Sequence, residues 1–162
     1  MQMPEPDARV LAAKPRAVAR LRGALPEGAV IDAPEEVRAY ECDALTAYTC
    51  PPLAVTLPAS TDEVAAILRI CHDEGVPVVP RGSGTSLAGG ALPTADSVIL
   101  GVARLTEVLE VDYSDRIIRV QTGRTNLSVT GEVEDDGFFY APDPSSQLAC
   151  AIAGNIAMNS GG

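Results

Sequence analysis

The chain has 162 residues, of which 46% are hydrophobic, and its formal net charge is −10 because 22 acidic residues outnumber 12 basic ones. This length and composition are sufficient for one globular domain with its own core. The acidic balance argues against nucleic acid as a partner, because phosphate backbones are held by clustered lysines and arginines.

The sequence also argues against a membrane span, a secretory signal and a metal site. The longest uncharged run, residues 144–162, is broken by Gly154, Asn155 and Asn159 and is too short to cross a bilayer. The N-terminus has no early apolar block, so we expect a cytoplasmic protein. The four cysteines are widely spaced and His72 is the only histidine. We therefore expect free thiols and no metal site.

The first quarter of the chain predicts one helix followed by an ordered connector. Val18, Leu21 and Leu25 recur at helical spacing and predict an amphipathic helix over residues 15–25. Residues 27–52 contain several prolines and no sustained hydrophobic period. They predict a connector without long helices or strands.

A strand–helix–strand unit is predicted next. Residues 53–58 and 76–79 are rich in β-formers, and the segment between them has complete helix signals. Ser60 is the expected N-cap, Glu63 completes a capping box, and Gly75 ends the helix. The apolar stripe expected in the core consists of Val64, Ile67, Leu68 and Cys71. Two strands joined in this way are usually parallel.

The middle of the chain is predicted to be rich in strands. The three predicted strands cover residues 97–102, 107–112 and 116–123. A helix is expected over residues 125–137, capped by Thr125 or Asn126, although Gly131 and several β-branched residues weaken this prediction.

A glycine-rich stretch, PRGSGTSLAGG at residues 80–90, follows the second strand of this unit. It does not fit a dinucleotide-binding Rossmann turn, because the glycine after Gly84 comes only at Gly89 and no long helix can follow. It does not fit a phosphate-binding P-loop either, because Gly90 stands where that motif requires lysine.

Two interpretations of this stretch stay open. The backbone N–H groups could form a nest for an anion, with Ser83, Thr85 and Ser86 adding hydroxyl donors. Such a nest would suit a pyrophosphate in an acidic protein. The alternative is a glycine-rich connection that binds no ligand.

A second segment, residues 141–162, has Asp143 as its only charged residue; it contains the rigid turn PDPSS and continues with alanine, glycine, asparagine and serine. These small residues leave space for a flat ring system and supply donors for its heteroatoms. A tightly packed turn without a ligand is the alternative.

Together, VPVVPRGSGTSLAGGA, YAPDPSS and GNIAMNSGG resemble the FAD-binding domain of FAD-linked oxidases in the vanillyl-alcohol oxidase/PCMH superfamily. The similarity is greatest to the FAD-linked subunit of glycolate oxidase and its D-lactate dehydrogenase relatives, and it extends from about residue 40 to the end. It implies an α+β fold: the N-terminal α/β subdomain of a PCMH-type FAD-binding domain plus the start of the second subdomain. The implied division is a helix and connector at 1–50 and an incomplete FAD-binding domain at 51–162, without the substrate cap.

The resemblance also implies the cofactor and its contacts. FAD would be bound non-covalently, because Thr85 stands where covalent members often carry a histidine. The expected pyrophosphate loop consists of Pro80, Arg81, Gly82, Ser83, Gly84, Thr85, Ser86, Gly89 and Gly90. Further parts of FAD are expected to contact Pro142, Asp143, Ser145, Ser146, Gly154, Asn155 and Asn159. Within the loop, we interpret Arg81 as scaffold.

The implied activity is oxidation of a small 2-hydroxy acid, of the glycolate or D-lactate type, by hydride transfer to FAD. The catalytic residues are not identified, because family members run several hundred residues and carry them later in the chain. An iron–sulfur electron-transfer subunit is an implied partner. The alternative is a non-catalytic, truncated FAD-fold module that acts in binding or assembly. We expect the fragment alone to be inactive, to bind FAD weakly, and to expose apolar residues between Leu148 and Met158.

Overall fold

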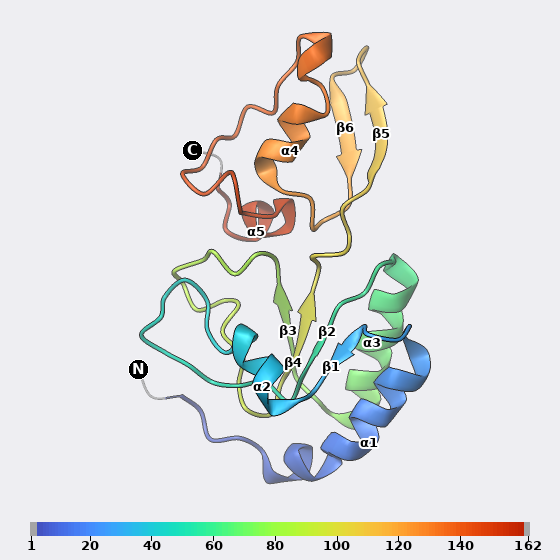
Figure 1. Cartoon of the computed structure of the whole chain (residues 1–162), viewed down its shortest axis with the longest axis vertical. Helices are drawn as coiled ribbons and strands as arrows, with labels where there is room; N and C mark the ends of the chain where they lie inside the picture. The colour runs from blue at the N-terminus through green and yellow to red at the C-terminus, as the bar shows by residue number, and fades with distance from the viewer. Residues whose placement is uncertain (1–2, 161–162) are drawn as a thin grey trace.

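The computed structural model describes residues 3–160 and divides into two stacked lobes (Figure 1). We call residues 3–105 the N-terminal lobe and residues 106–160 the C-terminal lobe. Gly161 and Gly162, which end the predicted motif, lie outside the described residues. The fold is α+β, as the sequence predicts. None of the described helices is both long enough and apolar enough to cross a membrane.

The N-terminal lobe is built on a four-stranded sheet with the order β1-β2-β4-β3. Its strands are β1 (Val30–Ile31), β2 (Ala54–Thr56), β3 (Val78–Arg81) and β4 (Val98–Gly101). Helix α3 (Thr61–Glu74) connects β2 to β3. Both of these strands run parallel to β4, which lies between them, while β1 pairs antiparallel with β2. The predicted parallel strand–helix–strand unit is therefore confirmed, with one strand inserted.

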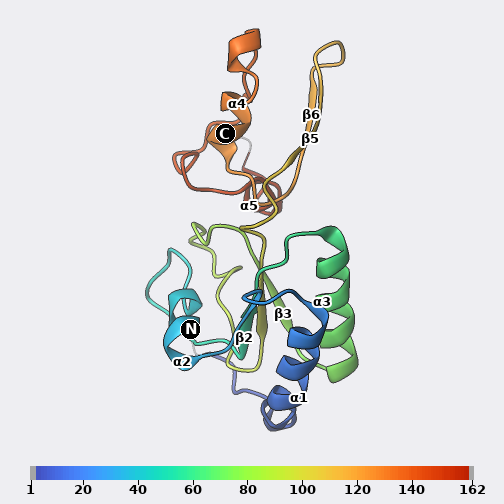
Figure 2. The same cartoon turned by 45° about the vertical axis from the view of Figure 1, so that its right-hand side comes forward.

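Helices cover both faces of this sheet (Figures 1 and 2). One face packs against α3 and the long helix α1 (Ala8–Ala24), with Leu21 and Ile67 fully buried between them and the strands. The other face packs Ile99 against the short helix α2 (Pro34–Val37) and the 3-10 helix η1 (Arg38–Tyr40). The alternation of side chains along each strand thus supplies two cores.

The first predicted helix is confirmed, but its predicted start at residue 15 is wrong. Helix α1 begins at Ala8, where the Asp7 side chain caps the N-terminus by accepting a hydrogen bond from Arg9 N. Pro15 lies inside the helix. The prediction failed because proline usually marks a helix start rather than an interior position.

The signals of the second predicted helix are confirmed at both ends. Ser60 Oγ accepts from Glu63 N at 3.2 Å, and Gly75 closes the helix in the left-handed conformation. The predicted core stripe is wrong at one position. Leu68 is 47% exposed, and Ile70 is buried in its place.

The C-terminal lobe is smaller and less regular. Strands β5 (Val108–Asp112) and β6 (Ile117–Val120) lie within two of the predicted strands, and they pair as an antiparallel hairpin. The rest consists of α4 (Asn126–Gly131), the 3-10 helix η2 (Glu134–Asp136) and α5 (Ile152–Ala157). The helix predicted over 125–137 is wrong in length, since α4 ends at Gly131 and gives way to η2.

The two lobes meet at a crossing where the backbone passes too close for any side chain. Gly123 N donates to Leu105 O at 2.8 Å. A β-carbon on Gly123 would lie 1.8 Å from Val102 O, so only glycine fits there. This crossing fixes the start of the C-terminal lobe against the end of β4.

Candidate functional site

A cavity of about 460 Å³ opens between the lobes and is lined by the two segments that the sequence singled out. We call residues 82–90 the glycine loop and residues 146–160 the small-residue segment. The glycine loop follows β3 directly, at the carboxyl end of the parallel strands. This edge is the usual ligand-binding position in open parallel sheets.

The backbone of the glycine loop presents unused donors. The N–H groups from Gly82 to Leu87 donate to no acceptor among the residues that the structure describes. Gly84 has φ +70°, a conformation that favours glycine. A β-carbon there would lie 2.3 Å from the Arg81 guanidinium. The loop is thus folded closely over Arg81 and has free N–H groups along its length.

The loop is held in place by the connector that precedes β2. Arg81 Nη1 donates to Cys42 O at 2.7 Å and to Ala91 O at 3.2 Å. The Arg81 guanidinium also lies 5.8 Å from the centre of the Tyr40 ring. Gly89 N donates to the Asp43 carboxylate at 2.9 Å. Because the guanidinium binds main-chain oxygens, these contacts favour the scaffold interpretation of Arg81.

The opposite wall is the small-residue segment, which approaches the loop closely. A β-carbon on Gly82 would lie 3.3 Å from Ala151 Cβ, tighter than ordinary contact. Ser86 Oγ lies 3.7 Å from the sulfur of Met158. Short side chains on both walls therefore keep the cavity open to a flat group while bringing the two backbones together.

The structure brings most of the predicted site residues to this cavity. Those that line it are Pro80, Arg81, Gly82, Ser83, Gly84, Thr85, Ser86, Gly90, Ser146, Gly154 and Asn155. Those that do not are Gly89, Pro142, Asp143, Ser145 and Asn159. Pro80 and Arg81 also belong to β3 rather than to the loop, because the strand runs two residues further than the predicted 76–79.

Sequence reasoning missed several lining residues. They are Leu87, Ala91, Val102, Cys150, Ala151, Ala153, Ala157, Met158 and Ser160. Most are apolar or very small, and such residues give no chemical signal in a sequence. Their role is visible only once the segments are folded together.

A smaller cavity of about 420 Å³ shares part of its lining with the first. Both cavities are lined by Gly82, Ser83, Val102 and Ala151, and the smaller one adds Arg124. The buried Arg124 Nε atom has no hydrogen-bond partner among the described residues. The two cavities therefore meet the same residues at the start of the glycine loop.

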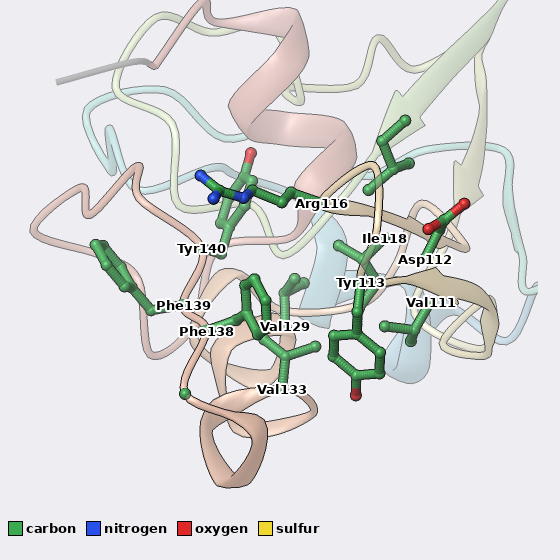
Figure 3. A pocket seen from close by; sticks show the side chains of 12 residues that line it. Val111, Asp112, Tyr113, Arg116, Ile118, Val129, Val133, Phe138, Phe139 and Tyr140 are labelled. Atoms are coloured by element: carbon green, nitrogen blue, oxygen red, sulfur yellow. The ribbon is translucent and has the colours of Figure 1, made fainter.

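A third cavity, of about 450 Å³, lies within the C-terminal lobe (Figure 3). Its lining is mostly aromatic and aliphatic, and the rings of Tyr113 and Phe138 are tilted by 41° with their centres 5.3 Å apart. Tyr113 OH donates to Asp136 at 2.5 Å, and this bond raises the pKa of the phenol. None of the predicted site residues lines this cavity.

The cysteines are free, and no cluster of three or more histidine, cysteine, aspartate or glutamate residues suited to a metal ion occurs within residues 3–160. Cys71 is buried in the core, and burial raises the pKa of its thiol to about 11. It is therefore protonated and inert at neutral pH. Cys150, by contrast, is buried at the wall of the first cavity.

Comparisons with known proteins agree with this geometry. The profile of a family described as FAD binding domain matches residues 52–162. The chain is 48% identical over 142 residues to glycolate oxidase subunit GlcD of Escherichia coli strain K12, covering 88% of this chain and 28% of the relative. It is 34% identical over 142 residues to D-2-hydroxyglutarate dehydrogenase of Xanthomonas citri, covering 88% and 30%. The chain thus spans less than a third of these curated relatives.

Solved structures share the fold at lower identity. Alkyldihydroxyacetonephosphate synthase matches with a TM-score of 0.83 at 20% identity, covering 100% of this chain and 32% of that one. p-Cresol methylhydroxylase with substrate bound matches with a TM-score of 0.75 at 18% identity, covering 95% and 30%. These likenesses concern the arrangement of the elements alone.

Proposed function

Because the chain belongs to the FAD binding domain family, with residues 52–162 matched, we propose that it is the FAD-holding part of a dehydrogenase that oxidises 2-hydroxy acids. Residues 51–162 carry the cofactor site in this proposal, and residues 1–50 supply the helix and connector that support it. The sequence relatives include proteins named for the oxidation of glycolate, D-lactate and D-2-hydroxyglutarate. These substrates share a hydroxyl group next to a carboxylate.

The observation that carries the proposal is the row of free N–H groups from Gly82 to Leu87 at the cavity. Successive backbone donors in a concave loop bind phosphate oxygens well. A protein with a net charge of −10 needs such a local site, since its general field repels a dianion. The loop therefore suits the pyrophosphate of FAD.

The remaining parts of FAD have matching surroundings. The flat ring would be held in the first cavity, between the glycine loop and the small residues around Gly154. Gly82 and Ser83, which also line the smaller cavity, would hold the adjoining part of the cofactor. Asp143 and Asn159 were predicted to contact FAD but do not line the cavity. In this proposal they shape the backbone near the two ends of the small-residue segment.

In the reaction, FAD supplies the chemistry by accepting a hydride from the α-carbon of the 2-hydroxy acid. This chain binds and orients the cofactor: the loop holds the pyrophosphate and the small-residue segment limits access of water to one face. We assign no general base and no substrate-binding arginine to residues 3–160. These groups, with an iron–sulfur electron-transfer partner, belong to the longer enzyme in this proposal.

The proposal includes a reducing compartment, the cytoplasm, because four cysteines without a disulfide are typical of one. The alternative function, a non-catalytic module for binding or assembly, predicts a coding sequence that stops at Gly162. An enzyme subunit predicts a reading frame that continues. Sequencing the source DNA beyond this codon distinguishes the two.

The cofactor site is tested by Gly84→Val. A β-branched side chain at φ +70° would displace Arg81 and close the row of donors. We expect FAD affinity of the chain, titrated up to millimolar FAD, to fall at least about tenfold, the effect of losing one or more charge-assisted hydrogen bonds. Circular dichroism should change little, because the loop contains no helix or strand.

Gly28→Val is the matched control. Gly28 also has a left-handed φ of +76°, but nothing lies within 4 Å of its β-carbon position and it is not a lining residue of the cavity. It should lose stability through the same backbone strain and keep its FAD affinity. Equal affinity in the wild-type chain and Gly84→Val would contradict the pyrophosphate assignment.

The cofactor should also be released by acid. Thr85 lies at the cavity, and the glycine loop contains no histidine that could form a bond to the flavin. Precipitation of the FAD-loaded protein with trichloroacetic acid should leave all yellow colour in the supernatant. Flavin that stays in the washed pellet would show that a covalent link exists.

A further inference from the structure

Asn126 is buried behind the wall of the cavity and does not line it. The side chain is 1% exposed and stands at the first residue of α4. The chain around it pairs with the small-residue segment, since Asn126 N donates to Cys150 O at 2.9 Å and Thr125 forms a bridge with Ala151. Asn126 is therefore joined to the segment by its main chain.

Its side chain adds two further bonds to the same part of the chain. The Asn126 amide donates to Pro142 O at 3.0 Å and to Asn155 Oδ1 at 3.2 Å. One acceptor is the turn that leads into the small-residue segment, and the other lies in α5. A single buried amide thus ties α4 both to the turn that precedes the wall and to α5 within it.

The second of these bonds continues to the cavity. The Asn155 amide donates to Cys150 Sγ at 3.2 Å, and both residues line the first cavity while being over nine-tenths buried. Asn155 N makes no hydrogen bond to the glycine loop. The Asn155 side chain is oriented by Asn126, whose amide donates to Asn155 Oδ1. The chain of contacts from Asn126 through Asn155 to Cys150 runs from behind the wall to its inner surface.

We propose that Asn126 is a positioning residue that holds the small-residue segment at the spacing the cofactor requires. It acts through Asn155 and Cys150 and touches no ligand itself. A buried amide is retained only where its donors have acceptors, and here one acceptor, Asn155, lies in the wall and the other, Pro142 O, lies in the turn that leads into it. The predicted effect on FAD affinity rests on the proposed function, whereas the predicted effect on the position of the small-residue segment does not.

The test measures the reactivity of Cys150 in the whole chain. Cysteine alkylation by N-ethylmaleimide, resolved by peptide mass spectrometry, should be slow at Cys150 in the wild type because the thiol is 4% exposed. In Asn126→Ala the rate at Cys150 should rise at least about tenfold, as expected when a buried hydrogen bond no longer opposes local opening. Cys71, in the core of the other lobe, should stay unreactive in both proteins and serves as the internal reference.

Val129→Ala is the matched control variant. Val129 lies on the same helix and is equally buried at 1%, but its side chain faces the aromatic cavity in the C-terminal lobe (Figure 3). It should lower the melting temperature without changing the rate at Cys150. Asn126→Asp, which keeps the size but removes the donor, should behave like Asn126→Ala. Asn126→Ser retains a hydroxyl donor and should fall between wild type and alanine if the alanine variant does not fold.

The outcomes distinguish an effect on the position of the wall from an effect on FAD binding. Unchanged Cys150 rates in Asn126→Ala and Asn126→Ser, or an equal rise in Val129→Ala, would overturn the proposal. FAD affinity measured on the same proteins should fall at least about tenfold in Asn126→Ala and stay unchanged in Val129→Ala. Opening of the wall with unchanged FAD affinity also overturns it. If the wild type binds no FAD even at millimolar concentration, the proposed function fails, and the thiol rates still decide whether Asn126 holds the wall.

Discussion

The two lobes supply one wall of the cavity each, but they are built very differently. The N-terminal lobe has a four-stranded sheet with helices on both faces, and Leu21, Ile67 and Ile99 are completely buried in it. The C-terminal lobe has a two-stranded hairpin and short helices, and Phe139 and Ile156 are more than 70% exposed. A sheet of two strands is marginal by itself.

This difference indicates which wall of the cavity is held more firmly. The glycine loop continues directly from β3, an edge strand of the four-stranded sheet, so its start is fixed by a lobe with a complete core. The small-residue segment depends on a few buried groups and on the crossing at Gly123. The second wall is thus the part that local opening should reach first.

The largest effect is expected where the lobes join. In Gly123→Ala the new β-carbon cannot fit against Val102 O, so the crossing must shift. We expect a loss of at least about 4 kcal/mol in the C-terminal lobe, as for other severe backbone clashes. Hydrogen exchange should become fast in β5, β6 and α4 while α3 remains protected.

Gly131→Ala is the control for this prediction. Gly131 ends α4 and has nothing within 4 Å of its β-carbon position. Alanine there should be neutral or stabilise by up to about 1 kcal/mol. Loss of protection in α3 together with β5 in Gly123→Ala would mean that the lobes unfold as one unit.

A smaller effect, on the other lobe, is expected from Ile67→Ala. Ile67 is 0% exposed between α3 and the sheet, so truncation should cost about 2–5 kcal/mol in unfolding free energy. Leu68→Ala, on the exposed side of the same helix, should stay within about 0.5 kcal/mol. Urea unfolding followed by circular dichroism measures both. Similar losses in the two variants would contradict the orientation of α3.

The smallest effect is expected from Glu74→Gln and depends on pH. Hydrogen bonds from Arg20 and Arg16 lower the pKa of the Glu74 carboxyl in the folded protein. A lowered folded pKa means that the ionised carboxylate stabilises the fold above the unfolded value near 4.5, and that this contribution is lost as the pH falls through the folded pKa.

The stability difference between wild type and Glu74→Gln should therefore be complete at pH 7 and disappear in acid. Thermal unfolding from pH 7 to pH 3 measures it. Arg9→Gln is the control, since the Arg9–Asp7 ion pair lies at α1's own N-terminus and joins no second element. A difference that grows toward low pH would refute the role of Glu74 in joining α1 to α3.

Local signals in the sequence predicted the elements that are stabilised locally. Ser60 and Gly75 mark the ends of α3 because both act on the helix backbone beside them. The strand β1 could not be predicted, since its two residues become a strand only by pairing with β2. Leu68 and Ile70 exchanged places because the face of α3 that is buried depends on where α1 lies.

The candidate site was predictable on the side where glycines and hydroxyls reveal it. The glycine loop is recognisable because Gly84 requires a special backbone conformation. Cys150 and Ala151 gave no such signal, since their contribution is close approach to Gly82 from a distant part of the chain. Asn126 was expected only as a possible helix cap, whereas its amide bonds residues 16 and 29 positions away.

The contacts between the connector and the glycine loop bear on how this cofactor-binding unit could be transplanted into another protein. The family match begins at residue 52, yet the acceptor for Arg81 is Cys42 O and the partner of Gly89 is Asp43. A graft that begins at the family boundary would leave the Arg81 guanidinium without one of its two main-chain acceptors and Gly89 without the Asp43 carboxylate. The smallest portable unit therefore begins no later than Tyr40, whose ring faces Arg81.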